Sequence, residues 1–264
     1  MMDTIIKSYN RKLMAPADSK QHDASTGIEK VAKELIEISD GRLEKQLSGI
    51  LVPQRELIVM IVGNHSAGKS SFINWYVDEP IQRAKVSIET VEINLIMQGN
   101  EREDFSGHNA IKMLPFLGDL LNRERKTELF PGLLENMALK TSTSTSRNFS
   151  NIIFIDTPGL ADGNLRYKFD VEGSIEWFAC KSDLILVFLD PQGQALCKRT
   201  MKIVKELYDQ QLCENKVHFV MTKGDVFETD DDRLKCMCQI TQSLATVLPP
   251  MHGFAMPIIS LPGK

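Results

Sequence analysis

The chain contains 264 residues, of which 42% are hydrophobic and 25% are charged, and its formal net charge is -4. This composition is ordinary for a folded protein and gives no sign of a nucleic-acid partner. No apolar run reaches the roughly 18 residues that span a membrane, and the start of the chain lacks the apolar region of a signal peptide. Together with the five cysteines, this favours a cytoplasmic protein with reduced thiols.

The N-terminal part is predicted to consist of an arm followed by a helix. Residues 1–26 are polar and show no sustained hydrophobic period, so we interpret them as a flexible arm. In residues 27–52 apolar side chains recur at helical spacing, and Ser25 or Thr26 can cap such a helix. The opposite face of this helix is not strongly basic, which favours packing against protein over contact with a membrane surface.

Residues 53–264 are predicted to form one α/β domain, because short apolar runs alternate there with segments of helical period. Such an order predicts a mostly parallel central sheet flanked by helices, which binds ligands at the carboxyl ends of its strands. The expected strands are 57–62, 86–98 at an edge of the sheet, 151–156, 183–190, 216–222 and, less regularly because of Pro257, 254–260. The expected helices are 69–77, 171–180, 196–211 and 233–247.

Residues 100–150 are the irregular part of this domain. A helical segment is expected at 110–121. The serine and threonine run at 141–146 has a composition that does not pack a core, so we interpret it as a polar surface connection, with a phosphorylated loop as the alternative.

The segment GNHSAGKS follows a predicted strand, opens a predicted helix and matches the phosphate-binding pattern G-x-x-x-x-G-K-[ST]. Its glycines let the backbone wrap around phosphates, and the N–H groups at the start of the helix point at the anion. In such loops the lysine reaches the β- and γ-phosphates and the hydroxyl binds Mg²⁺, which assigns Lys69 and Ser70. The expected nucleotide contacts are Gly63, Asn64, His65, Ser66, Ala67, Gly68, Lys69, Ser70 and Ser71.

Two further motifs follow predicted strands. Asp-Thr-Pro-Gly ends the strand at 151–156, where GTPases place an aspartate that holds Mg²⁺ through water and a glycine that senses the γ-phosphate. These residues are Asp156 and Gly159, and a plain β-turn is the alternative. Thr-Lys-Gly-Asp follows the strand at 216–222, where GTPases bind guanine. The carboxylate of such an aspartate accepts two hydrogen bonds from guanine, which adenine does not offer.

The expected contacts of the last motif are Thr222, Lys223 and Asp225, although a polar turn after a strand would look similar. The last two motifs are weak alone, but all three occur in GTPase order, each at the carboxyl end of a strand. The sequence therefore predicts a P-loop NTPase of the GTPase type, with GTP as substrate and Mg²⁺ as cofactor.

The run GNHSAGKSSFINWY resembles the P-loop of the dynamin superfamily. The run DTPGLADGNLRYKFDVEGSIEWFACKSDLILVFLD is more specifically similar to the EH-domain-containing (EHD) ATPases and sarcalumenin. This resemblance covers roughly residues 55–250 and is weak over 100–150. The shared positions after the Asp-Thr-Pro-Gly motif are Phe169-Asp170, Trp177-Phe178, Asp183 and Phe188.

The resemblance implies a dynamin-type G domain that forms a homodimer through its nucleotide face and works on membranes. It also implies that Thr90 is the switch I threonine and, with Ser70 and Asp156, a metal ligand. Ser66 corresponds to the family serine that contacts the nucleotide during hydrolysis. The catalytic residues would then be Ser66, Lys69 and Thr90, although a β-branched residue in a strand also accounts for Thr90.

Three departures from the family pattern matter. His65 stands where dynamins carry glutamine and EHD proteins carry tyrosine, so it contacts the γ-phosphate or is a tolerated surface residue. The EHD proteins bind ATP although Thr222–Asp225 looks like the guanine motif of dynamins, so ATP stays the alternative substrate. The lack of a recognisable stalk or EH module suggests a fragment or a truncated relative.

The expected function is slow, Mg²⁺-dependent hydrolysis of GTP in membrane remodelling or trafficking, by a protein that is cytoplasmic or peripheral on membranes. Leu160 and Ala161 follow Gly159, so no side chain there is an obvious general base. Two alternatives stay open: a nucleotide-gated binding switch with negligible hydrolysis, and a structural domain with a degenerate site. The intact Lys69, Ser70, Asp156 and Asp225 argue against the structural domain.

Overall fold

The computed structural model describes residues 56–82, 92–122, 127–162, 167–191, 197–209, 216–248 and 255–261. The predicted arm at 1–26, the predicted helix at 27–52 and the candidate switch threonine Thr90 lie outside the described residues. Among the residues that the structure does describe, no helix is both long enough and apolar enough to cross a bilayer.

The domain is built on a mixed, mostly parallel seven-stranded sheet with the order β3-β6-β2-β7-β1-β8-β9. Strands β7, β1, β8 and β9 run parallel to one another, whereas β2 is antiparallel to β7 and parallel to β6. A short antiparallel pair, β4 (Leu121–Asn122) with β5 (Thr127–Glu128), stands apart from the sheet. The strands of the sheet are β1 (Leu57–Gly63), β2 (Ile93–Gln98), β3 (Asp104–Ser106), β6 (Met137–Ser142), β7 (Ile152–Asp156), β8 (Leu184–Leu189) and β9 (Val217–Met221).

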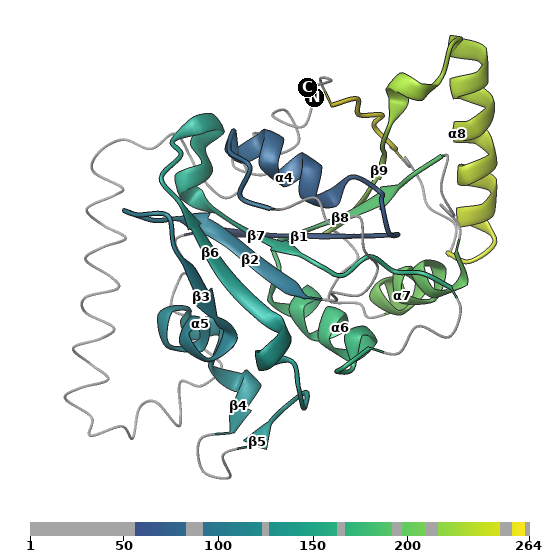
Figure 1. Ribbon diagram of the computed structural model, residues 1–264. Helices are drawn as coiled ribbons and strands as arrows, with labels where there is room; N and C mark the ends of the chain where they lie inside the picture. Colours follow the sequence, from purple (N-terminus) through teal and green to yellow (C-terminus); the bar gives the residue numbers. More distant parts are fainter. Residues whose placement is uncertain are drawn as a thin grey trace, which may run out of the picture. The chain divides into compact units, whose positions relative to one another are not determined.

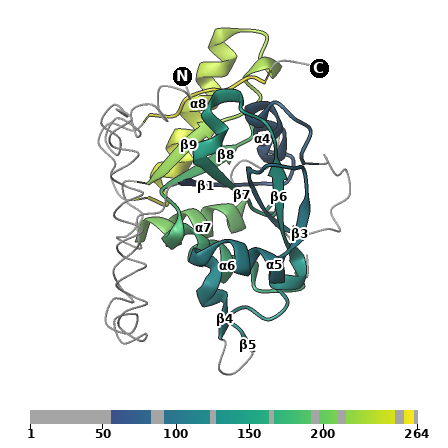
Figure 2. The same cartoon turned by 90° about the vertical axis from the view of Figure 1, so that its left-hand side faces the viewer.

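Helices cover both faces of this sheet, which confirms the predicted α/β class. Figures 1 and 2 place α4 on one face and α6 and α7 on the other. Every residue of β1, β7 and β8 is buried, as expected for parallel strands between two helical layers. The helices are α4 (Lys69–Val77), α5 (Gly107–Met113), α6 (Val171–Lys181), α7 (Lys198–Asp209) and α8 (Asp230–Ala245).

An aromatic cluster fixes α4 on the sheet directly behind the phosphate-binding loop. The ring of Phe72 is 5.3 Å from that of Phe188 and 6.3 Å from that of Phe154, both at steep angles. Phe72, Phe154 and Phe188 are almost completely buried, and burying one such side chain contributes about 1.5–3 kcal/mol. The first turn of α4 is therefore anchored by β7 and β8, two of the strands that end at the predicted site.

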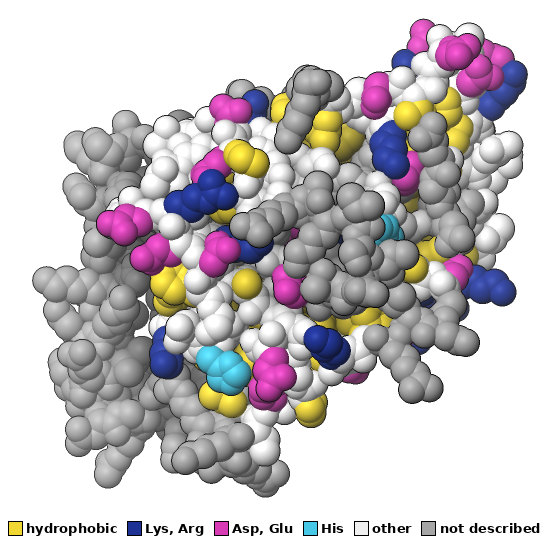
Figure 3. All heavy atoms as spheres, viewed as in Figure 1, with side chains coloured by type: hydrophobic (Ala, Val, Ile, Leu, Met, Phe, Trp, Pro, Cys, Tyr) yellow, Lys and Arg dark blue, Asp and Glu magenta, His cyan; other side chains and the backbone are white. Residues whose placement is uncertain are grey.

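The first turn of α8 gathers acidic residues at the surface. Asp230, Asp231 and Asp232 are exposed there, and Thr229 caps the helix by accepting a hydrogen bond from the backbone N of Asp232. Acidic side chains also gather over this part of the molecule in Figure 3. Negative charge at a helix N-terminus is favourable, so this cluster has a local structural explanation.

The predicted edge position of the strand at 86–98 is wrong. Its described part, β2, is an interior strand between β6 and β7. β2 is fully buried at Ile93, Leu95 and Ile96 and partly buried at its other positions, although β6 and β3 extend the sheet beyond it.

Residues 100–150 contain more regular structure than their composition indicates. The predicted helix at 110–121 begins earlier, as α5, and ends before Pro115, where a 3-10 helix (Pro115–Leu120) follows. A proline lacks the N–H that continues a helix. The run at 141–146 is not entirely a surface connection, because Thr141 and Ser142 are buried in β6. The Thr141 hydroxyl donates to Glu101 O, and the Ser142 hydroxyl donates to the Glu79 carboxylate.

The predicted last strand at 254–260 is reduced to one parallel bridge, between Ile258 and Met221. The backbone N of Met221 donates to Pro257 O over 2.9 Å, and the backbone N of Ile259 donates to Met221 O over 2.8 Å. Because Pro257 has no N–H, it accepts but cannot extend the ladder.

Candidate nucleotide site

The phosphate-binding loop leaves β1 in a conformation that few residues tolerate. A Cβ atom at Gly63 would lie 2.5 Å from Phe188 O, so only glycine fits against β8. Gly68 has a φ of 84° directly before α4, and Ser66 has a φ of 62°. A left-handed residue other than glycine carries about 1–3 kcal/mol of strain, which clusters at binding sites. Ser66 is exposed, as a residue facing a ligand would be.

Lys69 is the charged centre of the loop. It is 6% exposed, and its Nζ donates to Gly63 O over 3.1 Å and to Asn64 O over 3.0 Å. Burial lowers the pKa of Lys69 to about 8, although the nearby Asp156 carboxylate opposes the shift. A buried ammonium with only carbonyl partners in its own loop is poised to bind an anion.

Ser70 and Asp156 form the oxygen pair that the sequence predicted. The Ser70 hydroxyl donates to Asp156 Oδ2 over 2.7 Å, although the two residues are 86 positions apart. Burial raises the pKa of Asp156, and the charge of Lys69 and the hydrogen bond from Ser70 oppose this. A hydroxyl and a carboxylate suit Mg²⁺, which takes few protein ligands and completes its shell with water and phosphate oxygens.

The donor set of this pair fits Mg²⁺ better than a transition metal. Among the described residues no group of three or more His, Cys, Asp or Glu side chains forms a site of its own. A second donor also reaches the carboxylate, because Gln82 Nε2 donates to Asp156 Oδ2 over 3.2 Å. Sequence reasoning missed Gln82, which belongs to none of the three motifs.

The loop after β7 packs against the phosphate-binding loop. The backbone N of His65 donates to Leu160 O over 3.0 Å, and the backbone N of Leu160 donates to Gly63 O over 3.2 Å. Gly159 is required here, because a Cβ atom would lie 2.7 Å from the Cα of His65. The His65 ring contacts the Ser66 hydroxyl, with 2.9 Å between Nδ1 and Oγ. The first two motifs therefore form one structural unit.

Asn64 is buried, and its side chain points to α7. Its Oδ1 accepts hydrogen bonds from the Thr200 hydroxyl and from Cys197 Sγ, the latter over 3.4 Å. Its backbone O accepts from Lys69 and from the backbone N of Ala67. We therefore expect Asn64 to shape the loop, and its side chain to have no direct contact with phosphate.

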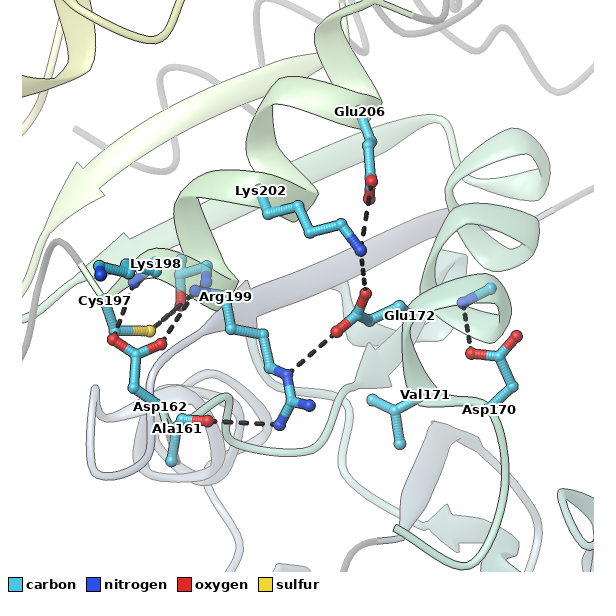
Figure 4. A network of polar contacts seen from close by, with 12 residues as sticks. Ala161, Asp162, Asp170, Val171, Glu172, Cys197, Lys198, Arg199, Lys202 and Glu206 are labelled. Atoms are coloured by element: carbon cyan, nitrogen blue, oxygen red, sulfur yellow. Dashed lines mark hydrogen bonds and ion pairs between the residues drawn. The ribbon is translucent and has the colours of Figure 1, made fainter. Parts of the chain in front are cut away.

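The start of α7 also holds the segment after Gly159, as Figure 4 shows. The Asp162 carboxylate accepts from the backbone N of Lys198 over 2.9 Å and from that of Arg199 over 3.0 Å. These two hydrogen bonds lower the pKa of Asp162, and the bond from Arg199 has the larger effect. Arg199 in turn donates to Ala161 O over 3.3 Å and pairs with Glu172 of α6 over 3.0 Å. Sequence reasoning gave none of these residues a role.

The third motif lies on the same edge of the sheet. Phe188 pairs with Gly63 on one side and with Val220 on the other, so β1, β8 and β9 end at one level. Two strand spacings put the first and third motifs about 10 Å apart. Thr222 is buried and its backbone N donates to Leu189 O over 2.9 Å. Asp225 is exposed in a 3-10 helix (Gly224–Val226).

Lys223 is held by a buried carboxylate that the sequence analysis left without a role. Its Nζ lies 2.6 Å from Asp190 Oδ2, and the Asp190 side chain is 1% exposed. Lys223 also has a left-handed φ of 53°. Gly224 allows a close approach, because its Cβ atom would lie 2.5 Å from Ile258 Cγ2. The turn that carries Asp225 is thus fixed from two sides.

The described residues thus bring together the P-loop, Asp156 and Gly159, and place Thr222, Lys223 and Asp225 along the same edge. Ser71 is the exception among the described residues, since its side chain is exposed in the first turn of α4 and makes no hydrogen bond to the other motifs. The roles of all these residues stay predictions, and Thr90 lies outside the described part of the chain.

Comparison with known proteins identifies the family. The model of the 50S ribosome-binding GTPases matches residues 58–223. EH domain-containing protein 2 of Rattus norvegicus is 25% identical over 185 residues, which cover 65% of this chain and 31% of that protein. EH domain-containing protein 1 of Arabidopsis thaliana is 24% identical with the same coverage. The chain therefore spans about a third of the length of these relatives.

A solved structure of an oligomerised bacterial dynamin pair, described as sensing and tethering membranes, shares the fold. Its TM-score is 0.57 at 18% identity, and the match covers 92% of this chain and 38% of that one. These findings confirm the predicted resemblance to the dynamin superfamily and its EHD branch. Because the matched residues make up more than half of the chain and include the first two motifs, the chain belongs to the family of 50S ribosome-binding GTPases.

Proposed function

We propose that this chain binds GTP together with Mg²⁺ and hydrolyses the γ-phosphate slowly. The observation that carries the proposal is the meeting of Lys69, Ser70 and Asp156 at one edge of the sheet. The Ser70 hydroxyl donates to Asp156 across 86 positions of sequence, and the charge of Lys69 interacts with the same carboxylate. A lysine, a hydroxyl and a carboxylate in this arrangement are the parts that P-loop NTPases use to bind a triphosphate.

Lys69 is proposed to neutralise the β- and γ-phosphates. Its Nζ would exchange Gly63 O and Asn64 O for phosphate oxygens, which compensate an ammonium charge better than carbonyls do. Ser70 and Asp156 would hold Mg²⁺, with Thr90 as a further ligand. When bound, Mg²⁺ supplies positive charge to the phosphate oxygens.

Slow turnover is proposed because no general base follows Gly159. Leu160 is buried, and the Asp162 carboxylate is occupied by the start of α7. Ser66, which is exposed in a left-handed conformation, and Thr90 would place the attacking water without accepting its proton. A second subunit that docks across the nucleotide face would accelerate the reaction.

Guanine is proposed as the base. The exposed Asp225 carboxylate would accept from guanine N1–H and N2–H₂, while the stem of Lys223, held by Asp190, would lie along the ring. Adenine is the alternative, because the resemblance to the EHD branch implies ATP.

Membrane association belongs to the proposal as well. The bacterial dynamin pair, whose description names an oligomerised protein and membranes, supports this part of the proposal. The family resemblance adds a cytoplasmic protein that works at the membrane periphery as a homodimer. Membrane trafficking or remodelling is the proposed setting.

The test is binding of GTP and ATP, side by side, with and without Mg²⁺. Lys69→Ala should abolish binding, whereas the matched variant Lys205→Ala, at an exposed position of α7, should leave it unchanged. Asp225→Asn should remove the preference for GTP. A preference for ATP would refute the base assignment, and binding of neither nucleotide would refute the proposal. Single-turnover hydrolysis separates a slow enzyme from a binding switch.

A further inference from the structure

Gln82 is a buried side chain in contact with the Mg²⁺-binding pair. It is 5% exposed and follows α4 by five residues. Its Nε2 donates to Asp156 Oδ2, the same oxygen that accepts from the Ser70 hydroxyl. One carboxylate oxygen therefore receives two donors, of which one belongs to the P-loop and the other to no recognised motif.

The backbone of Gln82 is fixed by α4 itself. Asn74 Oδ1 accepts from the backbone N of Gln82 over 2.7 Å, and Asn74 Nδ2 donates to Gln82 O over 2.7 Å. Asn74 lies four residues after Ser70, so both side chains lie on the same side of the helix. The helix that presents the Ser70 hydroxyl thus also places Gln82.

Lys140 of β6 determines which way the Gln82 amide faces. Its Nζ donates to Gln82 Oε1 over 2.8 Å. An ammonium only donates and a carboxylate only accepts, so an amide between them has one favourable orientation. The oxygen of Gln82 must face Lys140, and its nitrogen must face Asp156. Methionine would serve neither neighbour, and glutamate would set a second carboxylate against Asp156.

A role in closing the turn after α4 does not account for this arrangement. The two backbone bonds to Asn74 already close that turn. The side chain makes two further bonds to residues that are 58 and 74 positions away. One of them reaches the carboxylate that the proposed function assigns to Mg²⁺, and the other orients the amide that makes this bond.

We propose that Gln82, oriented by Lys140, is a positioning residue of the Mg²⁺ site that holds the Asp156 carboxylate where it accepts the Ser70 proton. A serine hydroxyl that donates its proton to a carboxylate keeps its lone pairs available for a metal. The inference rests on the proposed function. Outer partners of metal ligands of this kind change metal affinity about 10–100-fold when they are removed.

The test compares Gln82→Met with Gln98→Met. Gln98 is a partly buried glutamine on β2 whose Nε2 donates to Ser144 O over 3.1 Å, so its replacement also removes a side-chain hydrogen bond. Binding of fluorescent mant-GTP, with mant-ATP in parallel, is measured in EDTA and then as Mg²⁺ is added. Gln82→Met should raise the Mg²⁺ concentration for half-saturation about tenfold or more, with affinity in EDTA close to wild type. Gln98→Met should change neither.

Three outcomes would overturn the inference. An unchanged Mg²⁺ requirement in Gln82→Met removes the positioning role and leaves the proposed function intact. An equal loss of affinity with and without Mg²⁺ indicates a purely structural role. A wild-type protein whose nucleotide binding ignores Mg²⁺ overturns the inference and the proposed cofactor together. If Gln82→Met does not fold, the half-buried Lys140 is replaced instead. Lys140→Met should raise the Mg²⁺ requirement as well, but less, and an unchanged requirement would overturn the inference.

Discussion

Replacement of Asp162 by alanine should destabilise the domain through the start of α7. The carboxylate accepts from the backbone N of Lys198 and of Arg199 and so satisfies two of the N–H groups that open a helix. Without it, both groups must bond to water, and the loop after Gly159 loses two of its hydrogen bonds to the helix. The first turn of α7 should then fray.

The size of the effect follows from the two bonds. Loss of a capping side chain costs about 1 kcal/mol, with a range of roughly 0.5–2 kcal/mol. Loss of a negative charge at an exposed helix N-terminus adds about 0.3–1 kcal/mol. The expected decrease in the free energy of unfolding is therefore about 1–2 kcal/mol, a shift of roughly 2–8 °C in the midpoint temperature for a domain of this size. Asp162→Asn should lose about half, because an amide oxygen still caps the helix.

Urea unfolding at neutral pH, followed by circular dichroism, measures the difference. The matched control is Asp209→Ala at the other end of α7, where an exposed acidic side chain opposes the helix dipole and its removal should not destabilise. Since the pKa of Asp162 is lowered in the folded protein, its contribution is complete above the unfolded pKa of about 3.9 and is lost as the pH falls through the folded pKa. Equal stability of Asp162→Ala and wild type at pH 7 would refute the reasoning.

Three further predictions concern single contacts. Gly159→Ala should weaken nucleotide binding and cost about 1–3 kcal/mol of stability, because its Cβ atom would meet the His65 backbone. Gly118 has open space around it, so Gly118→Ala should change neither nucleotide binding nor stability in the same assays. His218→Phe should make the free energy of unfolding less sensitive to acid. Burial lowers the pKa of His218, so the stability of the wild type should decline as the pH falls below the unfolded value of about 6.5. A wild-type stability that stays constant from about pH 7 to 5 would contradict this. Asp190→Asn should release Lys223, lower the free energy of unfolding by about 1.5–3 kcal/mol and weaken guanine nucleotide binding. Denaturant unfolding and GTP titration check it, and wild-type behaviour in both would show that the ion pair is dispensable.

The buried parallel strands could be predicted from the sequence because a strand covered on both faces needs an unbroken apolar run. β1, β7, β8 and β9 fall within a residue of the expected bounds. β2 was misplaced, since its neighbour β6 arises from residues 137–142, whose mixed composition resembles a loop. Whether a strand lies at the edge depends on all strands of the sheet. The pattern of β2 alone therefore could not place it in the interior while β6 was not recognised as a strand.

The candidate site divides in the same way. The P-loop, the Asp-Thr-Pro-Gly segment and the Thr-Lys-Gly-Asp segment are local patterns, so the sequence alone predicted them. Gln82 and Asp162 act through partners 74 and 36 positions away, and no local pattern marks them. Asn64 shows that a local pattern can also predict too much. It occupies a P-loop position that was predicted to contact nucleotide, but its side chain points to α7.

The first turn of α7 is where these distant contacts meet. Thr200 and Cys197 donate to Asn64 of the phosphate-binding loop, and the backbone of Arg199 donates to Asp162 of the loop after Gly159. Hydrogen bonds depend on distance and angle far more steeply than apolar contacts do. A displacement of either loop must therefore carry the start of α7 with it or break these bonds. The Glu172 carboxylate of α6 reaches the loop after Gly159 through Arg199, which bonds to Ala161 O, whereas α7 bonds directly to both phosphate-side loops.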